Sequence, residues 1–295
     1  MKKILSVITA LAVACSAMLL SGCSSVIEGV VSNPAQSSGS VGTQQDSFVP
    51  ENLNGKLTLN GSTSMAKVCQ ALGEAFMEKY PNVTVEKGGT GSGDAAKAVS
   101  AGTALIGDLS RDMKADEQPS SYAITQIAID GIVLAVNKTN KVTNLTSDQI
   151  SRIFKGEITN WKEVGGDDQK ITLIGREATS GTRDGFESIF KCAGKCKYAA
   201  EVTATGEVVA KVGNDKTAIG YISLDSVNDT IQACSVNGVK ATEENIANKT
   251  YIAQRPFIEI YKKGTDSDLV KAWFAFVKSA EGQKIIKDSG LIPVK

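Results

Sequence analysis

The chain has 295 residues, 32 basic and 32 acidic side chains, and no histidine. A balanced charge argues against a general nucleic-acid binder, whose domain is clearly basic. The absence of histidine removes the commonest general base and the commonest metal ligand, and we expect neither a metal nor a cofactor. A chain of this length can bury a large core and can form two domains.

The first 22 residues are typical of a secretory signal. Two lysines precede an apolar run over 4–20, which is marginal for a membrane span, and small residues follow before Cys23. The residues Leu20-Ser21-Gly22-Cys23 resemble a bacterial lipobox, in which the cysteine carries lipid. We therefore expect a lipoprotein signal peptide over 1–22 and a lipid anchor (palmitate) on Cys23; a plain secreted protein is the alternative.

The next segment, 23–54, has the composition of a flexible polar tether. Residues 24–53 are rich in Ser, Gly, Gln and Asn and contain no Lys or Arg. Such a segment cannot bury enough apolar area to fold alone. We expect it to space the folded body from the membrane.

From residue 55 onward the pattern alternates between strands and helices. Alternating or continuous apolar runs predict strands over 56–60, 83–86, 105–106, 128–137, 171–175, 219–222 and 258–261. Apolar residues at helical spacing predict helices over 64–79, 94–101, 146–154 and 181–190, and two more within 266–288. This alternation predicts an α/β fold with a mainly parallel sheet.

Four cysteines follow Cys23: Cys69, Cys192, Cys196 and Cys234. Cys192 and Cys196 are close enough in sequence to form a disulfide if their loop bends, and the spacing leaves this open. A zinc site is disfavoured because no histidine joins these cysteines. Cys69 lies on the apolar face of a predicted helix, where a cysteine is usually a core residue.

Three Gly/Ser/Thr turns enter predicted helices: Gly61-Ser62-Thr63-Ser64, Gly91-Ser92-Gly93 and Ser180-Gly181-Thr182. A helix N-terminus offers free N–H groups and a partial positive charge, hydroxyls add donors, and glycine lets an anion approach the backbone. One such turn is more often only a helix cap. Three together favour a shared oxyanion site.

Arg176 strengthens this prediction because it ends a predicted strand four residues before Ser180. Its planar guanidinium matches the geometry of a phosphate group. The competing interpretation of Arg176 is a surface ion pair with Glu177 or another carboxylate. Arg183, in the first turn of the next helix, is more often structural.

Over nearly all of 55–295 the sequence resembles the phosphate-binding lipoproteins of Pst-type bacterial phosphate ABC transporters. The resemblance rests on five segments: Gly61 through Ser64, Gly88 through Gly93, Ile150 through Trp161, Arg176 through Thr182 and Ile219 through Leu224. It implies a two-lobed, periplasmic-binding-protein-like fold of type II with the ligand in the cleft between the lobes. Lobe I would be 55–134 plus 256–295, and lobe II 135–255.

The resemblance also implies the function and the binding residues. The protein would bind inorganic phosphate outside the cytoplasm, anchored to the cell membrane, and deliver it to the permease and ATPase subunits of an ABC importer. The phosphate ligands of the family carry over to Thr63 and Ser64, to Ser92, and to Arg176, Ser180, Gly181 and Thr182; Ser62 belongs to the first turn.

Two departures from the family concern carboxylates. Some members have an aspartate where this chain has Ser110, and a carboxylate where it has Ala178. A buried carboxylate accepts a hydrogen bond from the proton that phosphate keeps and repels sulfate, which has no proton. Asp130 is the candidate replacement; it could equally be a turn residue or a partner of Arg111.

Two other functions remain as alternatives. One is a receptor for another tetrahedral oxyanion, such as sulfate, molybdate or tungstate. The other is a phosphatase with Ser62, Ser92 or Ser180 as its nucleophile, which is disfavoured because a serine nucleophile needs an adjacent base and the chain has no histidine.

Overall fold

The computed structural model describes residues 52–294, which belong to one compact unit, residues 46–295. The predicted signal peptide, Cys23 and most of the predicted tether lie outside the described residues. None of the described helices combines the length and the hydrophobicity that crossing a membrane requires.

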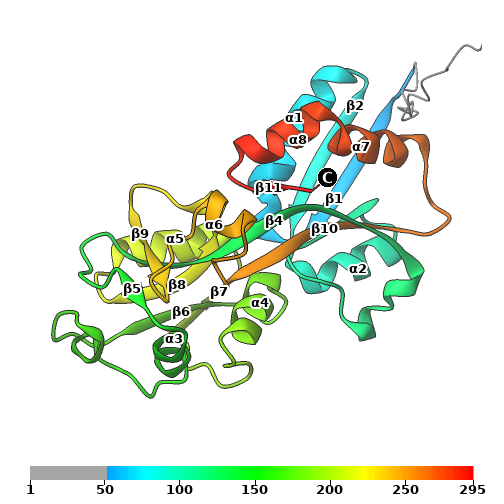
Figure 1. The fold of residues 1–295 in the computed structure, drawn as a ribbon. Coiled ribbons are helices and arrows are strands. Elements are labelled where there is room, and N and C mark those ends of the chain that lie inside the picture. Colours follow the sequence, from blue (N-terminus) through cyan, green and yellow to red (C-terminus); the bar gives the residue numbers. More distant parts are fainter. Residues whose placement is uncertain (1–51, 295) are drawn as a thin grey trace, which may run out of the picture. The chain divides into compact units, whose positions relative to one another are not determined.

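Strands and helices alternate along most of the chain (Figure 1). The strands are β1 (Gly55–Gly61), β2 (Val83–Gly89), β3 (Ile106–Leu109), β4 (Tyr122–Asn137), β5 (Asn144–Leu145), β6 (Thr172–Arg176), β7 (Ala200–Val202), β8 (Ala218–Ser223), β9 (Ile231–Val236), β10 (Gln254–Lys262) and β11 (Ile292–Pro293). The α-helices are α1 (Ala66–Lys79), α2 (Ser92–Ser100), α3 (Ser147–Phe154), α4 (Gly181–Ile189), α5 (Thr205–Asn214), α6 (Glu243–Ala247), α7 (Asp268–Lys278) and α8 (Ala280–Asp288).

Two long strands, β4 and β10, connect two halves of the described chain (Figure 1). Residues 122–131 of β4 pair with β10, whereas residues 132–137 pair with β8 and β9. The strand order is β2-β1-β3-β10-β4-β8-β6-β7, so the chain crosses between the halves through β4 and returns through β10.

Each half has its own hydrophobic core. One half packs Leu57, Phe76 and Trp273 between the sheet and helices α1 and α7, and it packs Ala95 and Leu109 on the α2 side. The buried residues of these clusters all precede residue 129 or follow residue 256. The buried residues in the clusters of the other half all lie within 132–253. The change from one core to the other therefore falls near residue 131 of β4.

The predicted parallel sheet is only partly correct. β1 pairs in parallel with β2 and β3, and β6 with β7 and β8. The connecting strands β4 and β10 run antiparallel to their neighbours in the main strand order. Local periodicity cannot reveal this, because β10 returns to β3 and β4 after more than a hundred residues.

Candidate functional site

Three helix starts and one 3-10 turn meet between the two halves. The turn η1 (Thr63–Met65) and α2 come from the first half, and α4 and α5 come from the second. Each presents backbone N–H groups at its first turn, which are unpaired within the helix and attract anions. The three Ser/Thr/Gly turns of the sequence, separated by up to about 120 residues, lie at these positions.

One cluster of hydroxyl groups joins the first half to the second. The Ser64 Oγ lies 2.6 Å from the Thr182 Oγ1 and 3.1 Å from the Thr205 Oγ1. Arg176 donates from Nη1 to Thr205 Oγ1 at 3.1 Å and from Nη2 to Thr63 Oγ1 at 3.0 Å. Ser64, Arg176, Thr182 and Thr205 are buried. A cation thus lies among hydroxyls that both donate and accept hydrogen bonds.

A second cluster brings Ser92, Ser110 and Gly181 together. The Ser92 Oγ lies 3.2 Å from the Ser110 Oγ and accepts a hydrogen bond from the Ser110 N–H at 3.1 Å. A Cβ atom on Gly181 would lie 2.4 Å from the Ser92 Oγ and 2.7 Å from the Ser110 Oγ. Only glycine therefore fits at 181, because any side chain would clash with both hydroxyls.

Ser62 and Ser180 are helix caps in this structure. The Ser62 Oγ accepts the Ser64 N–H at 3.2 Å, and the Ser180 Oγ accepts the Arg183 N–H at 3.3 Å. The capping interpretation therefore describes these two side chains as the structure has them. Both serines are buried beside the two clusters, so capping and anion contact do not exclude each other.

Arg176 is held on several sides. Its guanidinium donates to both carboxylate oxygens of Glu177, at 3.0 and 2.8 Å, so the expected partner Glu177 is correct, but Arg176 is only 1% exposed. Its backbone N–H donates to the Tyr221 hydroxyl and its carbonyl accepts from Arg183. Burial raises the pKa of Tyr221, which therefore stays neutral. Glu177 thus gives Arg176 a carboxylate partner, which Ala178 cannot supply.

Asp130 is bound to a different arginine from the one expected. Its Oδ2 accepts two hydrogen bonds from Arg255, at 2.9 and 2.7 Å, and its Oδ1 accepts from the Ser223 hydroxyl at 2.7 Å. The suggestion that Asp130 pairs with Arg111 was wrong, because Arg111 pairs with Glu117 and Asp184. Asp130 lies within β4, so it is no turn residue either. Its role toward a ligand stays a prediction.

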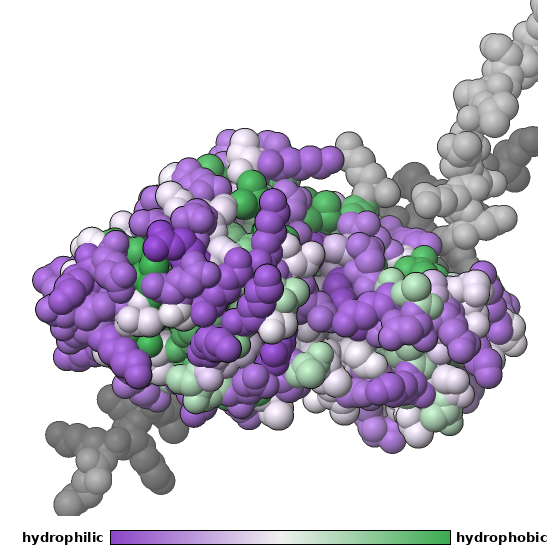
Figure 2. Space-filling view, turned by 90° about the horizontal axis from the view of Figure 1, so that it is seen from below, coloured by the Kyte–Doolittle hydropathy of each residue, from purple (hydrophilic) through white to green (hydrophobic). Residues whose placement is uncertain are grey.

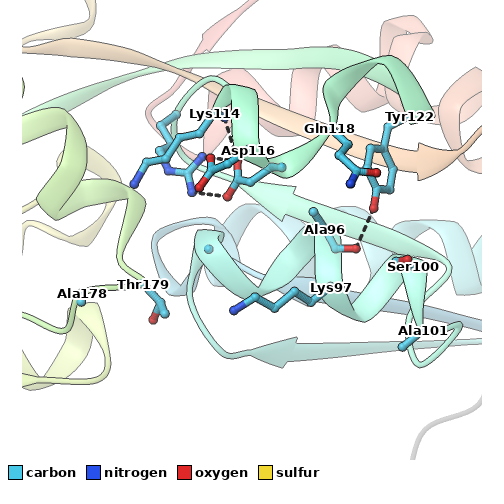
Figure 3. Close-up of a pocket in the computed structure, with 13 residues that line it drawn as sticks. Ala96, Lys97, Ser100, Ala101, Lys114, Asp116, Gln118, Tyr122, Ala178 and Thr179 are labelled. Carbon is cyan, nitrogen blue, oxygen red and sulfur yellow. Dashed lines mark hydrogen bonds and ion pairs between the residues drawn. The ribbon is translucent and has the colours of Figure 1, made fainter.

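An open pocket lies beside Thr179, and none of the residues of the two clusters lines it (Figure 3). Its volume is about 610 Å³, and it is lined by Lys97 and Lys114 of the first half and by Thr179 of the second. Gly93 also lines it and donates its N–H to the Thr179 carbonyl at 2.9 Å. Figure 2 shows a largely hydrophilic face with only small hydrophobic groups.

The four described cysteines are free thiols. The Cys196 Sγ lies 3.4 Å from the Cys192 carbonyl oxygen, so the loop does bend, but no disulfide joins the two residues. Cys69 is buried in a hydrophobic core, as its helical position predicted.

Thr205 is the residue that the sequence interpretation missed. It begins α5, a helix that was not predicted, and it bonds to Ser64 and Arg176. The signal was present: Thr205-Gly206 precedes Val208, Val209 and Val212 at helical spacing.

Comparisons with known proteins agree with this geometry. A family model described as a PBP superfamily domain matches residues 33–281. The phosphate-binding protein PstS of Bacillus subtilis is 33% identical over 257 residues, which cover 83% of this chain and 82% of the relative.

Two solved structures are also similar. A protein from Clostridium perfringens, described as a phosphate ABC transporter substrate-binding protein with bound phosphate, is 40% identical with a TM-score of 0.80 and covers 82% of this chain and 100% of its own. An ABC-type phosphate transport receptor from Vibrio cholerae is 34% identical with a TM-score of 0.68, over 81% of this chain and 100% of its own. The predicted α/β fold of periplasmic-binding-protein type is thereby confirmed, and the chain belongs to the PBP superfamily and, within it, to the family of PstS phosphate-binding proteins.

Proposed function

We propose that this protein is an extracytoplasmic receptor that binds inorganic phosphate and delivers it to an ABC importer. The observation that carries the proposal is the buried arrangement of Ser64, Thr182 and Thr205 around Arg176, at helix N-termini from both halves. Such groups stabilise a tetrahedral oxyanion through charge-assisted hydrogen bonds. The PstS relatives, which are named for phosphate binding, support phosphate as the anion.

The proposed ligand set combines the predicted residues other than Asp130, which is bonded to Arg255 and Ser223, with Thr205. It consists of Thr63, Ser64, Ser92, Ser110, Arg176, Ser180, Gly181, Thr182 and Thr205, with Ser62 holding the first turn. In the structure several of these hydroxyls bond to one another, so binding exchanges these hydrogen bonds for bonds to the phosphate oxygens. The exchange keeps every buried polar group paired.

We further propose that the two halves act as lobes that close on the ligand. Assigned by the hydrophobic clusters in which their residues pack, lobe I would be 55–131 plus 254–294 and lobe II would be 132–253. The boundary within β4 then follows residue 131, three residues before the boundary expected after residue 134. Strands β4 and β10 would be the hinge, because they are the paired strands that cross between the cores.

Selectivity against sulfate would then not depend on a free carboxylate in the ligand set. The Ser110 hydroxyl can accept a hydrogen bond from the protonated oxygen of phosphate, but it can equally donate a hydrogen bond to an oxygen of sulfate. Asp130 already accepts bonds from Arg255, Ser223 and the Leu224 N–H. A smaller preference for phosphate over sulfate is therefore expected than in relatives that keep the aspartate.

A role as a receptor without catalysis fits the contacts of the serines. Ser92 bonds to another hydroxyl, and Ser62 and Ser180 accept backbone N–H groups. Among the described residues, the hydrogen bonds of these side chains include none to a carboxylate or lysine that could act as a base. Hydrolysis of phosphate esters by the purified protein would contradict this.

The membrane anchor is part of the proposal and depends on Cys23. A Cys23→Ser variant should be released into the medium or the periplasm instead of fractionating with membranes, because the acylated residue is lost. Membrane association equal to that of the wild type would refute the anchor without affecting the phosphate site.

Isothermal titration with phosphate, sulfate, molybdate and tungstate tests the central claim. We expect phosphate to bind most tightly at neutral pH. If the protein binds another of these oxyanions and does not bind phosphate, the proposed ligand is wrong and that oxyanion is the ligand.

A further inference from the structure

A buried polar cluster lies directly beneath the turn Gly61–Ser64 and has no part in the site described so far. It contains Lys87 of β2, Asp108 of β3 and Glu259 of β10. Asp108 and Glu259 are fully buried and face each other across β3 and β10, and the Lys87 side chain is only 13% exposed. Buried charges are costly, so such a group needs a reason to be there.

The contacts of Lys87 link this cluster to the turn. The ammonium lies 2.9 Å from the Asp108 Oδ2 and donates to the Ser62 carbonyl at 3.3 Å and to the Gly88 carbonyl at 2.5 Å. The Ser62 N–H in turn donates to the Asp108 carbonyl at 2.8 Å. The Ser62 carbonyl is therefore held by the Lys87 side chain and the Ser62 N–H by the Asp108 backbone carbonyl, and Ser62 caps the turn that presents Ser64.

The charge state of the cluster follows from its surroundings. Burial, together with the nearby Asp108, raises the pKa of Glu259 to about 8, so this group is protonated at neutral pH. The Glu259 Oε2 accepts a hydrogen bond from the Trp273 indole N–H at 2.7 Å. Burial lowers the pKa of Lys87, but the Asp108 carboxylate more than reverses this, and the ammonium stays charged. Burial likewise keeps the neighbouring Cys69 thiol neutral by raising its pKa. Burial also raises the pKa of Asp108, and the Lys87 ammonium at 2.9 Å opposes this rise, so the contact between the two side chains is the ion pair of the cluster.

A metal ion is the competing occupant. Within the described part of the chain, ligand atoms of Cys69, Asp108 and Glu259 lie within 4.8 Å of one another. The Lys87 ammonium already lies at ion-pair distance from Asp108, however, and it supplies the cation that the carboxylate needs. The geometry therefore favours an ion pair that supports the turn.

We propose that Lys87 is a positioning residue for anion binding, which holds the Ser62–Ser64 turn in its binding geometry through the Ser62 carbonyl. Asp108 and Glu259 keep the lysine in place. The proposal rests on the proposed function, since it concerns the turn that contacts the anion.

Titration of four variants with phosphate tests the role of Lys87. Lys87→Met should weaken binding by roughly tenfold or more, the factor implied by losing a hydrogen bond from a charged group, whereas Lys87→Arg should recover most of the affinity. The double variant Lys87→Met/Asp108→Asn removes the orphaned carboxylate, so its thermal stability should recover while its affinity stays low. Lys56→Met is the control, because Lys56 is an exposed partner of Glu86 on the same sheet. It should change neither the phosphate affinity nor the thermal stability.

The double variant decides between positioning and mere stability. If its phosphate affinity returns to the wild-type value together with its stability, Lys87 is only structural and the proposal is overturned. Amide hydrogen exchange of the peptide covering 61–66, measured without ligand, gives a second readout. The exchange rate should rise in the double variant and not in Lys87→Arg. An unchanged exchange rate in the double variant overturns the proposal, whether or not the wild type binds phosphate. A wild type that binds no phosphate would by itself refute only the proposed function.

Discussion

Replacing Arg176 by alanine probes the proposed site most directly. The guanidinium is buried and donates to Thr63, Thr205 and Glu177, so the variant removes the cation and these charge-assisted hydrogen bonds. A hydrogen bond from a charged group contributes about 1.5–3 kcal/mol. Two such bonds to the anion would be lost.

The structure favours the lower end of the range of binding free energy that the loss of two such hydrogen bonds implies. The Glu177 side chain is 21% exposed, so water can solvate part of its carboxylate once the arginine is gone. We therefore expect a loss of about 3 kcal/mol, which is on the order of a 150-fold weaker affinity. The remaining hydroxyls and helix N-termini would keep weak binding.

Isothermal titration with phosphate at fixed pH and ionic strength measures this loss, with thermal unfolding as a check on the fold. Arg152→Ala is the matched control, since the Arg152 side chain is 47% exposed and pairs only with surface carboxylates. Its affinity should equal that of the wild type. A folded Arg176→Ala variant that binds phosphate within about threefold of the wild type, a difference below 1 kcal/mol, would refute the assigned site.

Three further outcomes are expected. Gly181→Ala should abolish tight binding, because its Cβ meets two hydroxyls, whereas Gly206→Ala, with open space around the Cβ, should not; equal titrations would contradict the close approach. Asp184→Asn should speed phosphate release roughly fivefold in stopped flow, because about 1 kcal/mol of ion pairing with Arg111 across the two halves is lost; an unchanged rate would show that the pair contributes nothing. The pKa of Glu259 is raised to about 8, so its stabilising contribution is full at low pH and is lost as the pH rises toward 8. Glu259→Gln should flatten the fall in thermal stability between pH 4.5 and about 8, and an equally steep fall would argue against a protonated Glu259.

The residues of the candidate site could largely be named from the sequence. Glycine, serine and threonine at helix starts carry a local chemical meaning, because a free helix N-terminus and a hydroxyl bind anions wherever they occur. Ser64, Ser92 and Thr182 were found in this way, and Arg176 was found from its guanidinium at the end of a predicted strand. Thr205 was missed because an alanine occupies the cap position before it.

The tertiary structure alone decided how these residues come together and which buried charged residues lie next to them. Periodicity reports only neighbours along the chain, whereas β10 returns to β3 and β4 and so determines the antiparallel pairing, the Asp130–Arg255 pair and the position of Glu259 beside Asp108. A charged residue within a strand is ambiguous in a sequence, since its cost depends on partners brought from elsewhere. The sequence by itself thus determined most residues of the proposed anion site, and the packing of distant strands decided which charges lie around them.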